Sequence, residues 1–395
     1  MASCLQHLAV ILHDLEGGGM QRVTITLIQA MLQQRPHLKI DLVVASAQGD
    51  YRQQIPAEVN LIDLHASFDF RTKSLARLVP RIRRYLRDNQ PPVILSCLPG
   101  LNCLTLLASF ALSKKPQIIL AEHTLPLAKW MAQETRDRQL PAGLLPRLTS
   151  PLMGFTYPWA QSIIAVSQGI AQELRQTLGE PARSDVQVIY NPVMDGALVA
   201  QAEVPLSHPW LAAGQSPVFL AVGRLAKQKD YPTLLAAFRQ LRQTRAAKLI
   251  ILGEGELRSQ LERMITQWDL TTDVELHGFV KNPYAYMQQA TALVLSSLWE
   301  TFGMVLAEAL ACGCPVISTD CEYGPREILA NGKYGALVPV GQVDKLAIAM
   351  EQVLTDDCDR AALIARGQEF TAAKAAMQYL QVLDASVQPS TADNA

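Results

Sequence analysis

The chain has 395 residues, of which 49% are hydrophobic and 18% charged, and this apolar content suffices for two domain cores and excludes a disordered or collagen-like protein. Its formal net charge is -1 at pH 7. Proteins that coat nucleic acid need a broadly cationic face, so we expect no nucleic-acid partner.

The cysteines and the N-terminus favour a cytoplasmic protein. The seven cysteines are an odd number and lie mostly in apolar runs, which favours reduced, buried thiols over a disulfide framework. Cys312-Gly313-Cys314 lacks a second pair of ligands, so we predict no metal site. The N-terminal 13 residues are typical of a first strand, and no segment has the roughly 20 apolar residues that span a bilayer. We expect a cytoplasmic protein, soluble or peripheral at the cytoplasmic face of a membrane.

Short apolar runs alternate with longer amphipathic stretches, which is typical of a parallel sheet covered by helices. The predicted strands are residues 8–12, 40–44, 93–97, 117–121 and 162–166 in a first series, and residues 218–222, 248–252, 274–278, 292–295 and 315–318 in a second. The restart of the pattern predicts two doubly wound α/β domains.

The domain boundary is predicted at Pro192, where a polar, proline-containing stretch up to Pro217 indicates a linker with surface loops. The predicted parts are a first domain over 1–192, a second over 193–367, a helix over 368–385 that is a candidate to pack back on the first domain, and a disordered tail over 386–395. Doubly wound domains bind ligands at the carboxyl ends of their strands, so functional residues are expected directly after strands.

A glycine turn follows the first predicted strand. Gly17, Gly18 and Gly19 precede a helical run, 23–32, and could let an anion approach the backbone at a helix N-terminus. The glycines do not form a GxGxxG pattern, so a phosphate site and a simple tight turn both remain open.

Two cations follow the first strand of the second series. Arg224 and Lys229 precede the predicted helix 233–242, and together they could clamp a diphosphate through charge-assisted hydrogen bonds. Solvated loop cations are the alternative.

Two glutamates, Glu300 and Glu308, lie eight positions apart across a glycine turn and a helix start. The first can lie on the loop and the second two turns into the helix, so they can address two ends of one ligand. Carboxylates accept hydrogen bonds from sugar hydroxyls, and the free N–H groups near Gly303 could hold phosphate oxygens. Glu308 interrupts an apolar run and would be costly to bury without a partner.

Two histidines end strands of the first domain. His123 follows the strand 117–121 and is a candidate for the ligand cleft because of that position. His13 ends the first strand and ranks below it.

Taken in order, these motifs resemble those of the family 4 retaining glycosyltransferases of the GT-B fold, over nearly the whole chain. The motifs are the glycine turn 17–19, Ala165-Val166-Ser167, Val188-Ile189-Tyr190-Asn191-Pro192, Gly223-Arg224-Leu225, Gln228-Lys229-Asp230, Leu252-Gly253-Glu254-Gly255, His277-Gly278-Phe279, the Glu300 and Glu308 pair, and Gly324-Pro325-Arg326-Glu327. The resemblance implies an α/β protein of two Rossmann-like doubly wound domains that face each other across a cleft, the first binding the acceptor and the second a nucleotide sugar.

The resemblance also implies roles for single residues. Arg224 and Lys229 would hold the donor pyrophosphate, Glu308 the ribose hydroxyls and Glu300 the hydroxyls of the transferred sugar. His123 would contact the sugar, and with Glu300, Arg224 and Lys229 it forms the expected catalytic set. The rest of the expected donor site is Gly18, Gly19, Phe279 and Val280 near the nucleobase, the backbone of Phe302, Gly303 and Met304, and Val305.

The reaction implied by the resemblance is transfer with retention at the anomeric carbon, without a metal ion or a cofactor beyond the nucleotide sugar. The leaving diphosphate would assist deprotonation of the acceptor, and cations that stabilise it would supply much of the catalysis. The stretch 319–327 favours a UDP-activated hexose or N-acetylhexosamine over a GDP-sugar. Trp299 stands where many relatives have tyrosine, and we do not expect it to change the reaction.

The acceptor is expected to be a glycan or a lipid-linked saccharide held by the first domain. A basic amphipathic stretch with Arg77, Arg81, Arg83, Arg84 and Arg87 between Leu78, Ile82, Tyr85 and Leu86 could rest on an anionic membrane. The apolar segment 125–159 could form a surface that receives a lipid-borne acceptor. A solvated arginine face and ordinary core packing are the respective alternatives.

Three other functions remain open beside the transferase. A sugar-nucleotide epimerase shares the architecture, but the order of the motifs counts against it. A catalytically silent sugar-nucleotide-binding subunit is disfavoured by the complete set of candidate catalytic residues. A dinucleotide-dependent dehydrogenase is disfavoured because GxGxxG is absent.

Overall fold

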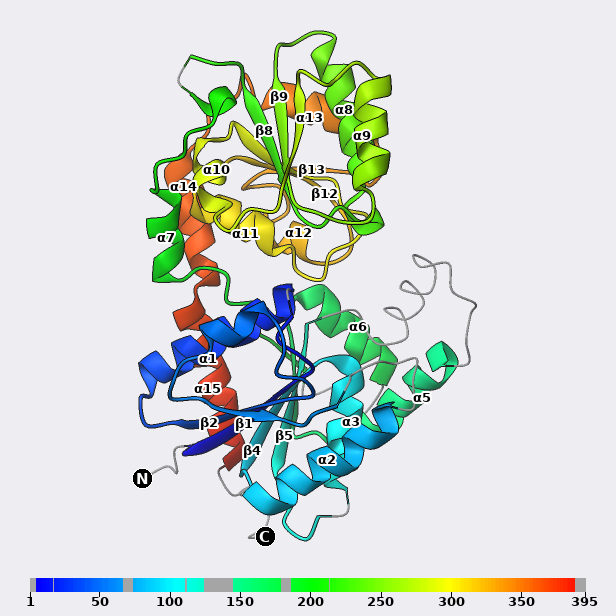
Figure 1. Ribbon diagram of the computed structural model, residues 1–395, viewed down its shortest axis with the longest axis vertical. Coiled ribbons are helices and arrows are strands. Elements are labelled where there is room, and N and C mark those ends of the chain that lie inside the picture. The colour runs from blue at the N-terminus through cyan, green and yellow to red at the C-terminus, as the bar shows by residue number, and fades with distance from the viewer. Residues whose placement is uncertain are drawn as a thin grey trace. The chain divides into compact units, whose positions relative to one another are not determined.

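The computed structural model describes residues 5–16, 18–66, 74–110, 112–123, 145–178, 186–212 and 214–387. The chain forms two compact units. Unit 1 consists of Met1–Pro192 together with Ala372–Ala395, and unit 2 of Val193–Thr371. In each unit, helices cover both faces of one sheet (Figure 1).

The sheet of unit 1 has seven strands in the order β3-β2-β1-β4-β5-β6-β7, and all its pairs are parallel. The strands are β1 His7–Leu12, β2 Lys39–Val44, β3 Asn60–Asp63, β4 Val93–Cys97, β5 Gln117–Glu122, β6 Ser162–Ala165 and β7 Val186–Val188. Every residue of the central strand β4 is buried, because helices exclude water from both faces of the sheet.

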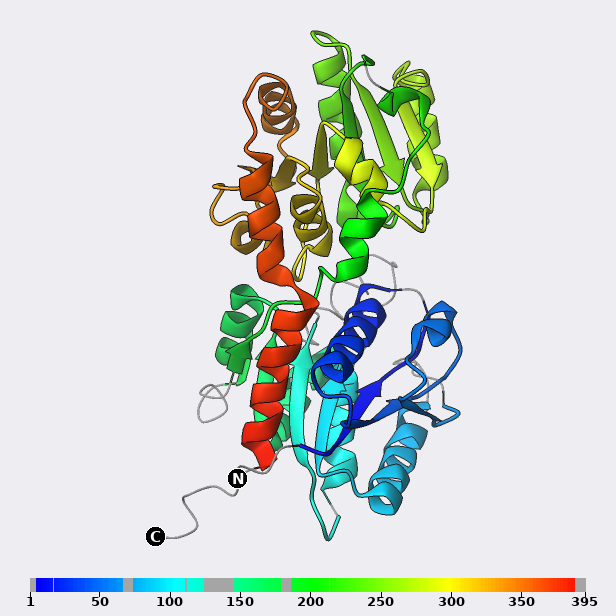
Figure 2. The same ribbon diagram turned by 90° about the vertical axis from the view of Figure 1, so that its left-hand side faces the viewer.

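Six helices surround this sheet within the described part of unit 1. They are α1 Gly19–Gln34, α2 Ser74–Asn89, α3 Pro99–Ser109, α5 Leu145–Thr156, α6 Gln168–Leu178 and α15 Ala372–Val387, with short 3-10 helices at Asp50–Gln54 and Tyr157–Trp159. The C-terminal helix α15 runs beside α1 (Figure 2) and contributes Tyr379 and Leu383 to the same core as β1 and β4. The Arg35 guanidinium and the Leu5 N–H both donate hydrogen bonds to the Asp384 carboxylate.

The C-terminal helix differs from the predicted one at both ends. Gln368–Phe370 is a 3-10 turn of unit 2, and the extended backbone of Thr371 separates it from α15. The helix then continues through Ser386 to Val387, so these two residues do not belong to a disordered tail. Ser386 is buried, and its hydroxyl donates to the Leu383 carbonyl within the helix. The rest of the predicted tail lies outside the described residues.

The sheet of unit 2 has six parallel strands in the order β10-β9-β8-β11-β12-β13. The strands are β8 Val218–Val222, β9 Lys248–Leu252, β10 Val274–Gly278, β11 Ala292–Leu295, β12 Val316–Thr319 and β13 Ala336–Val338. The helices are α7 Gly196–Ala202, α8 Tyr231–Arg242, α9 Arg258–Gln267, α10 Tyr284–Gln289, α11 Met304–Ala311, α12 Gly324–Ile328, α13 Val343–Gln352 and α14 Arg360–Gly367, with 3-10 helices at Pro209–Leu211 and Lys227–Lys229.

The stretch after Pro192 is part of unit 2 and not a linker of surface loops. It contains α7, whose first turn is capped by the Asp195 side chain, an acceptor for the Leu198 N–H. Leu198 and Ala202 are buried, and α7 packs against α10. Three edge strands, β3, β7 and β13, were also absent from the prediction.

Both sheets change direction of winding at one point. In unit 1 this switch lies between β1 and β4, and in unit 2 between β8 and β11, because from each central strand the order runs outward both ways. The two crossovers that leave such a point go to opposite faces of the sheet, which opens a crevice at the carboxyl ends of the two strands. The crevice of unit 2 therefore lies beside the residues that follow Val222 and Leu295.

Candidate functional site

The loops at the switch point of unit 2 are tied together by hydrogen bonds. Leu298 donates its N–H to the Gln228 carbonyl at 2.8 Å, and the Gln228 amide donates to the Trp299 carbonyl at 2.9 Å. The Ser296 hydroxyl donates to the Lys229 carbonyl at 2.7 Å. These hydrogen bonds fix the turn after β8 and the loop after β11 relative to each other.

The packing of these two loops brings Lys229 and Glu300 together. The Lys229 Nζ lies 2.5 Å from Glu300 Oε1, and both side chains are largely buried. The Ser297 hydroxyl donates to the same oxygen at 2.7 Å. The predicted diphosphate cation and the predicted sugar carboxylate are therefore direct partners, and an anionic ligand would have to compete for the Lys229 ammonium.

Arg224 and the N-terminus of α11 add positive potential to the same edge. Arg224 is exposed two residues beyond β8. Gly303 stands at the N-cap of α11 with a φ of 88°, and without a side chain it cannot cap the first turn. The Leu306 N–H donates to the Gly303 carbonyl, and the N–H groups of Met304 and Val305 are available to an anion, which the helix dipole also favours.

The remaining predicted donor residues lie around this helix and after β10. Glu308 is buried in the second turn of α11, and Val305 is also buried. The Phe302 ring packs against Phe370 at 5.6 Å, so Phe302 can offer a ligand only its backbone. Phe279, by contrast, is 77% exposed directly after Gly278. Met304 and Val280 are half-buried.

Close backbone packing shapes the loops of this edge. A Cβ on Gly253 would lie 2.0 Å from the Gly223 carbonyl oxygen, and a Cβ on Gly324 would lie 1.6 Å from the Phe302 carbonyl oxygen. Only glycine permits either contact. The loops after β8 and β9, and likewise the loops after β11 and β12, are therefore packed directly on one another.

In unit 1, His123 follows β5 and is buried. Its Nδ1 lies 3.1 Å from Asn191 Oδ1, an acceptor, so the imidazole carries its proton on Nδ1 and presents Nε2 as an acceptor. Burial lowers the pKa of His123 to about 4, and the hydrogen bond to Asn191 only partly offsets this. The side chain is neutral at physiological pH and can accept a hydrogen bond from a hydroxyl.

The glycine turn after β1 leads directly into a helix. Gly18 is the N-cap of α1, and Gly19 is its first residue, while Gly17 lies outside the described residues. A Cβ on Gly18 would lie 2.5 Å from the Gln21 amide oxygen, because Gln21 folds back over the turn. The Gln21 amide nitrogen also lies 2.8 Å from Asp14 and 3.2 Å from His13. Burial lowers the pKa of His13, so this imidazole favours its neutral form.

The last residue of β5, Glu122, is a buried acid that the sequence reasoning missed. Its Oε1 accepts hydrogen bonds from the Asn102 amide, at 2.7 Å, and from the Tyr157 hydroxyl. Neither partner is charged, so desolvation dominates and raises the pKa of Glu122 to about 7. Asn191 and Ser297 were missed as well. Their signals were present, since Asn191 lies in one of the motifs and Ser297 is the second residue after a predicted strand.

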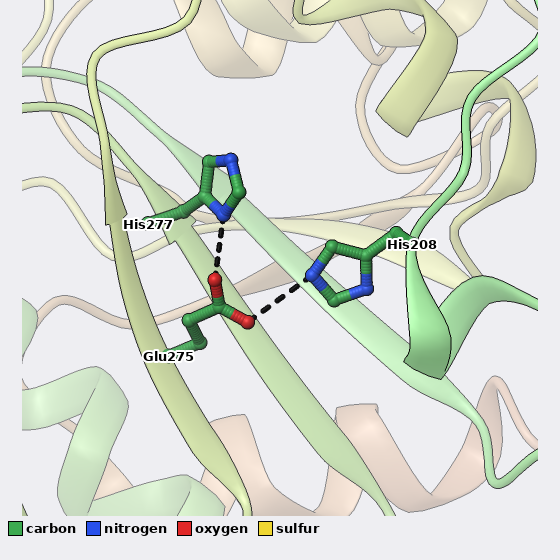
Figure 3. A group of neighbouring side chains, drawn as sticks. All are labelled: His208, Glu275 and His277. Carbon is green, nitrogen blue, oxygen red and sulfur yellow. Dashed lines mark hydrogen bonds and ion pairs between the residues drawn. The ribbon is translucent and has the colours of Figure 1, made fainter.

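Two histidines and a glutamate in unit 2 lie close enough to hold a metal ion, with ligand atoms of His208, Glu275 and His277 within 4.8 Å of one another. Glu275 Oε2 lies 3.1 Å from His208 Nε2, and Oε1 lies 2.6 Å from His277 Nδ1 (Figure 3). The Trp210 N–H donates to His208 Nδ1, so Nε2 keeps its proton and lacks the lone pair that a metal needs. The group therefore links the segment before Pro209 to the edge strand β10 by hydrogen bonds.

Two features bear on membrane contact. In α2, the residues between the arginines are buried in unit 1, namely Leu78, Ile82, Tyr85 and Leu86. This apolar face is occupied and cannot insert into lipid. Within the described residues, no helix is both long and apolar enough to cross a bilayer. Residues 125–144 of the second predicted segment lie outside the described part of the chain.

The fold and the sequence of the chain both match known glycosyltransferases. The lipopolysaccharide outer core galactosyltransferase WaaB matches with a TM-score of 0.74 at 20% identity, covering 96% of this chain and 99% of that one. HepE from Anabaena, solved with UDP and glucose, matches with a TM-score of 0.72 at 20% identity, covering 96% and 99%. The protein thus has the GT-B fold, with two Rossmann-like α/β domains.

The family follows from the sequence. Residues 17–195 match the model for Glycosyltransferase Family 4, and residues 207–370 match that for Glycosyl transferases group 1. A Campylobacter jejuni N-acetylgalactosaminyltransferase, which acts on a diphospho-undecaprenol-linked saccharide, is 27% identical over 364 residues, 89% of this chain and 91% of the relative. The chain belongs to glycosyltransferase family 4.

Proposed function

We propose that the protein transfers a hexose or N-acetylhexosamine, with retention, from a UDP-sugar to a glycan or a lipid-linked saccharide at the cytoplasmic face of a membrane. The observation that carries the donor site is the buried Lys229 and Glu300 pair beside the N-terminus of α11 at the switch point of unit 2. The saccharide acceptor and the preference for UDP draw support from the Campylobacter relative and from the HepE complex.

In this proposal the donor diphosphate binds between Arg224, Lys229 and the α11 N-terminus. Its arrival draws the Lys229 ammonium toward phosphate, which frees Glu300 to accept hydrogen bonds from the hydroxyls of the transferred sugar. Glu308 binds the ribose, and Phe279 and Val280 lie near the base. Three positive groups then face the leaving diphosphate, so the reaction needs no metal ion.

The acceptor is activated on the same face from which the diphosphate leaves. As the anomeric C–O bond to the phosphate breaks, a phosphate oxygen takes the proton of the acceptor hydroxyl, and the acceptor oxygen bonds to the anomeric carbon on that face. His123 Nε2, an acceptor in the tautomer that Asn191 selects, receives a hydrogen bond from a hydroxyl of the sugar. It orients that sugar and does not titrate near neutral pH.

A panel of UDP-, GDP- and ADP-sugars, tested with EDTA and with or without a membrane-lipid extract, distinguishes the candidate functions. We expect one UDP-sugar to raise the melting temperature of the protein. We expect UDP to be released from that sugar when lipid extract is present. Stabilisation without release would indicate a silent binding subunit. Conversion of the UDP-sugar to an epimeric UDP-sugar, without net release of UDP and without need of acceptor, would indicate an epimerase.

A further inference from the structure

Unit 1 exposes three neighbouring aromatic rings, of which Trp159 stacks on Phe110 and meets Phe155 edge to face. Phe110 and Phe155 are 61% and 62% exposed, and Trp159 is 36% exposed. The Trp159 ring lies 5.0 Å from that of Phe110 and 4.9 Å from that of Phe155. We call Phe110, Phe155 and Trp159 the aromatic patch. Large apolar rings gathered on one exposed surface are a candidate for contact with another molecule.

The backbone around the patch directs these rings outward. Tyr157 lies between Phe155 and Trp159 in sequence, and its buried hydroxyl is bonded to Glu122 in the core. Thr156 is buried as well. Because this turn is anchored on its inner side, Phe155 and Trp159 must face away from the core.

Positive charge lies beside the patch on the side of Phe110. Lys114 and Lys115 are exposed, and the Lys115 Nζ lies 5.8 Å from the centre of the Phe110 ring. Helix α2 lies alongside, because the Arg83 guanidinium donates to the carbonyls of Leu107 and Ala108, just before Phe110. On the same helix, Arg84 and Arg87 are mostly exposed, with the single carboxylate of Asp88 between them.

We infer that the aromatic patch and the cations beside it form the surface through which unit 1 contacts an anionic lipid bilayer. Aromatic rings partition into the interfacial layer of a membrane, and lysine and arginine beside them pair with anionic headgroups. The inference rests on one part of the proposed function, namely that the acceptor is linked to a lipid. It replaces the apolar face of α2, which is buried, as the membrane contact.

A second copy of the chain fits the patch less well. With aromatic side chains of about 200 Å² each, the three exposed parts together amount to on the order of 350 Å². A stable protein interface buries about 800 Å² per partner. Two copies meeting face to face would also bring Lys114 and Lys115 close to their own counterparts.

The patch lies at one edge of the sheet of unit 1. Phe110 precedes β5 and Trp159 precedes β6, so the patch lies at the amino ends of the strands. His123, at the carboxyl end of β5, lies at the opposite edge. A bilayer bound at the patch therefore leaves the ligand edge of unit 1 uncovered.

Vesicle flotation of the full-length protein tests the inference. We expect binding to vesicles of phosphatidylcholine mixed with phosphatidylglycerol, weakened by salt, and little binding to phosphatidylcholine alone. Phe110→Ser/Phe155→Ser should weaken binding about tenfold or more, and Lys114→Glu/Lys115→Glu should abolish the preference for anionic lipid. Met377→Ser, a half-exposed residue of α15, is the matched control and should bind like wild type.

Trp159 supplies a direct readout of contact. Brominated lipids should quench tryptophan fluorescence in wild type, and Trp159→Phe should lose most of this quenching. Wild-type binding by Phe110→Ser/Phe155→Ser would overturn the inference. The inference would also be overturned if the wild-type protein did not bind vesicles but formed a dimer, and if Phe110→Ser/Phe155→Ser dissociated that dimer. With a short, water-soluble acceptor, the variant and wild type should release UDP at equal rates. Failure of the vesicle test can therefore be told apart from failure of the proposed transferase activity.

Discussion

Two buried glutamates, Glu122 at the end of β5 and Glu300 in the loop after β11, have opposite surroundings. Glu300 faces a lysine ammonium and a serine hydroxyl, whereas Glu122 meets only the neutral groups of Asn102 and Tyr157. A carboxyl group in a dry site without a cation favours its protonated form. The pKa of Glu122 is accordingly raised, so its protonation is linked to the stability of unit 1.

Glu122→Gln should therefore change how stability depends on pH. Below about pH 4.5 the glutamate is protonated in both states, and between pH 4.5 and about 7 the unfolded chain loses its proton first, so wild type loses stability as the pH rises. The glutamine variant has no such proton. Its free energy of unfolding relative to wild type should rise by about 3 kcal/mol between pH 4.5 and 8.

Urea unfolding at several pH values measures this difference, with Glu58→Gln, an exposed residue of the same unit, as the control. His123 contributes in the opposite direction, since its lowered pKa makes wild type lose stability as the pH falls from 6.5 toward 4. This contribution cancels when variant and wild type are compared. If the difference in unfolding free energy between Glu122→Gln and wild type did not depend on pH, the raised pKa of Glu122 would be contradicted.

Ser297→Ala should impair turnover more than nucleotide binding. The Ser297 hydroxyl donates only to Glu300, the carboxylate proposed to contact the transferred sugar. Losing this hydrogen bond should lower kcat about 5- to 20-fold, with little change in the Kd for UDP. Ser297→Thr keeps the hydroxyl and should restore much of the rate, and Ser259→Ala, on an exposed helix start, is the control. Equal losses in kcat and in UDP affinity would point to a disturbed loop instead.

At the scale of elements, the central strands were predictable and three edge strands were not. Central parallel strands are buried on both faces and appear as apolar runs, as in β4 and β9. The edge strands β3, β7 and β13 are only three or four residues long and partly exposed. An edge strand needs one neighbour and little apolar surface, so its sequence resembles that of a loop.

In the candidate site, too, some features were predictable from the sequence and others were not. The types and positions of Arg224, Lys229 and Glu300 were readable, because each closely follows a predicted strand. The partnership of Lys229 with Glu300 was not, since 71 positions separate them and only the packing of two loops joins them. The contact of His123 with Asn191 spans 68 positions and was hidden for the same reason.

Helix α15 is the element whose attachment is most easily tested. Asp384 binds the Arg35 guanidinium and the Leu5 N–H, which fastens α15 to the start of the chain. Asp384→Ala should lower the free energy of unfolding by about 1–2 kcal/mol, because these groups are only partly buried and water replaces some of the contact. Urea unfolding measures the loss, with Asp357→Ala, an exposed carboxylate, as the control. No loss would mean that packing alone holds the helix.

At the scale of the whole molecule, the two units differ in continuity. Unit 2 is one uninterrupted segment, Val193–Thr371, while unit 1 needs α15 from the other end of the chain. A fragment of residues 193–371 should therefore fold and bind UDP by itself. Residues 1–192 alone should be unstable, because the missing helix exposes the core around β1 and β4.

Circular dichroism and calorimetry of the two fragments measure this difference. Adding residues 372–387 to the first fragment through a flexible linker should restore its cooperative unfolding. An isolated 1–192 fragment as stable as the linked one would show that α15 is dispensable to unit 1.

The central claim is that the nucleotide diphosphate binds at the switch point of unit 2 through Lys229, and calorimetric titration of UDP in the presence of EDTA tests it most directly. Lys229→Ala should raise the Kd for UDP about 10- to 100-fold, whereas Lys227→Ala, an exposed lysine two positions away, should leave it within about twofold of wild type. Equal affinities in wild type and Lys229→Ala would contradict the account.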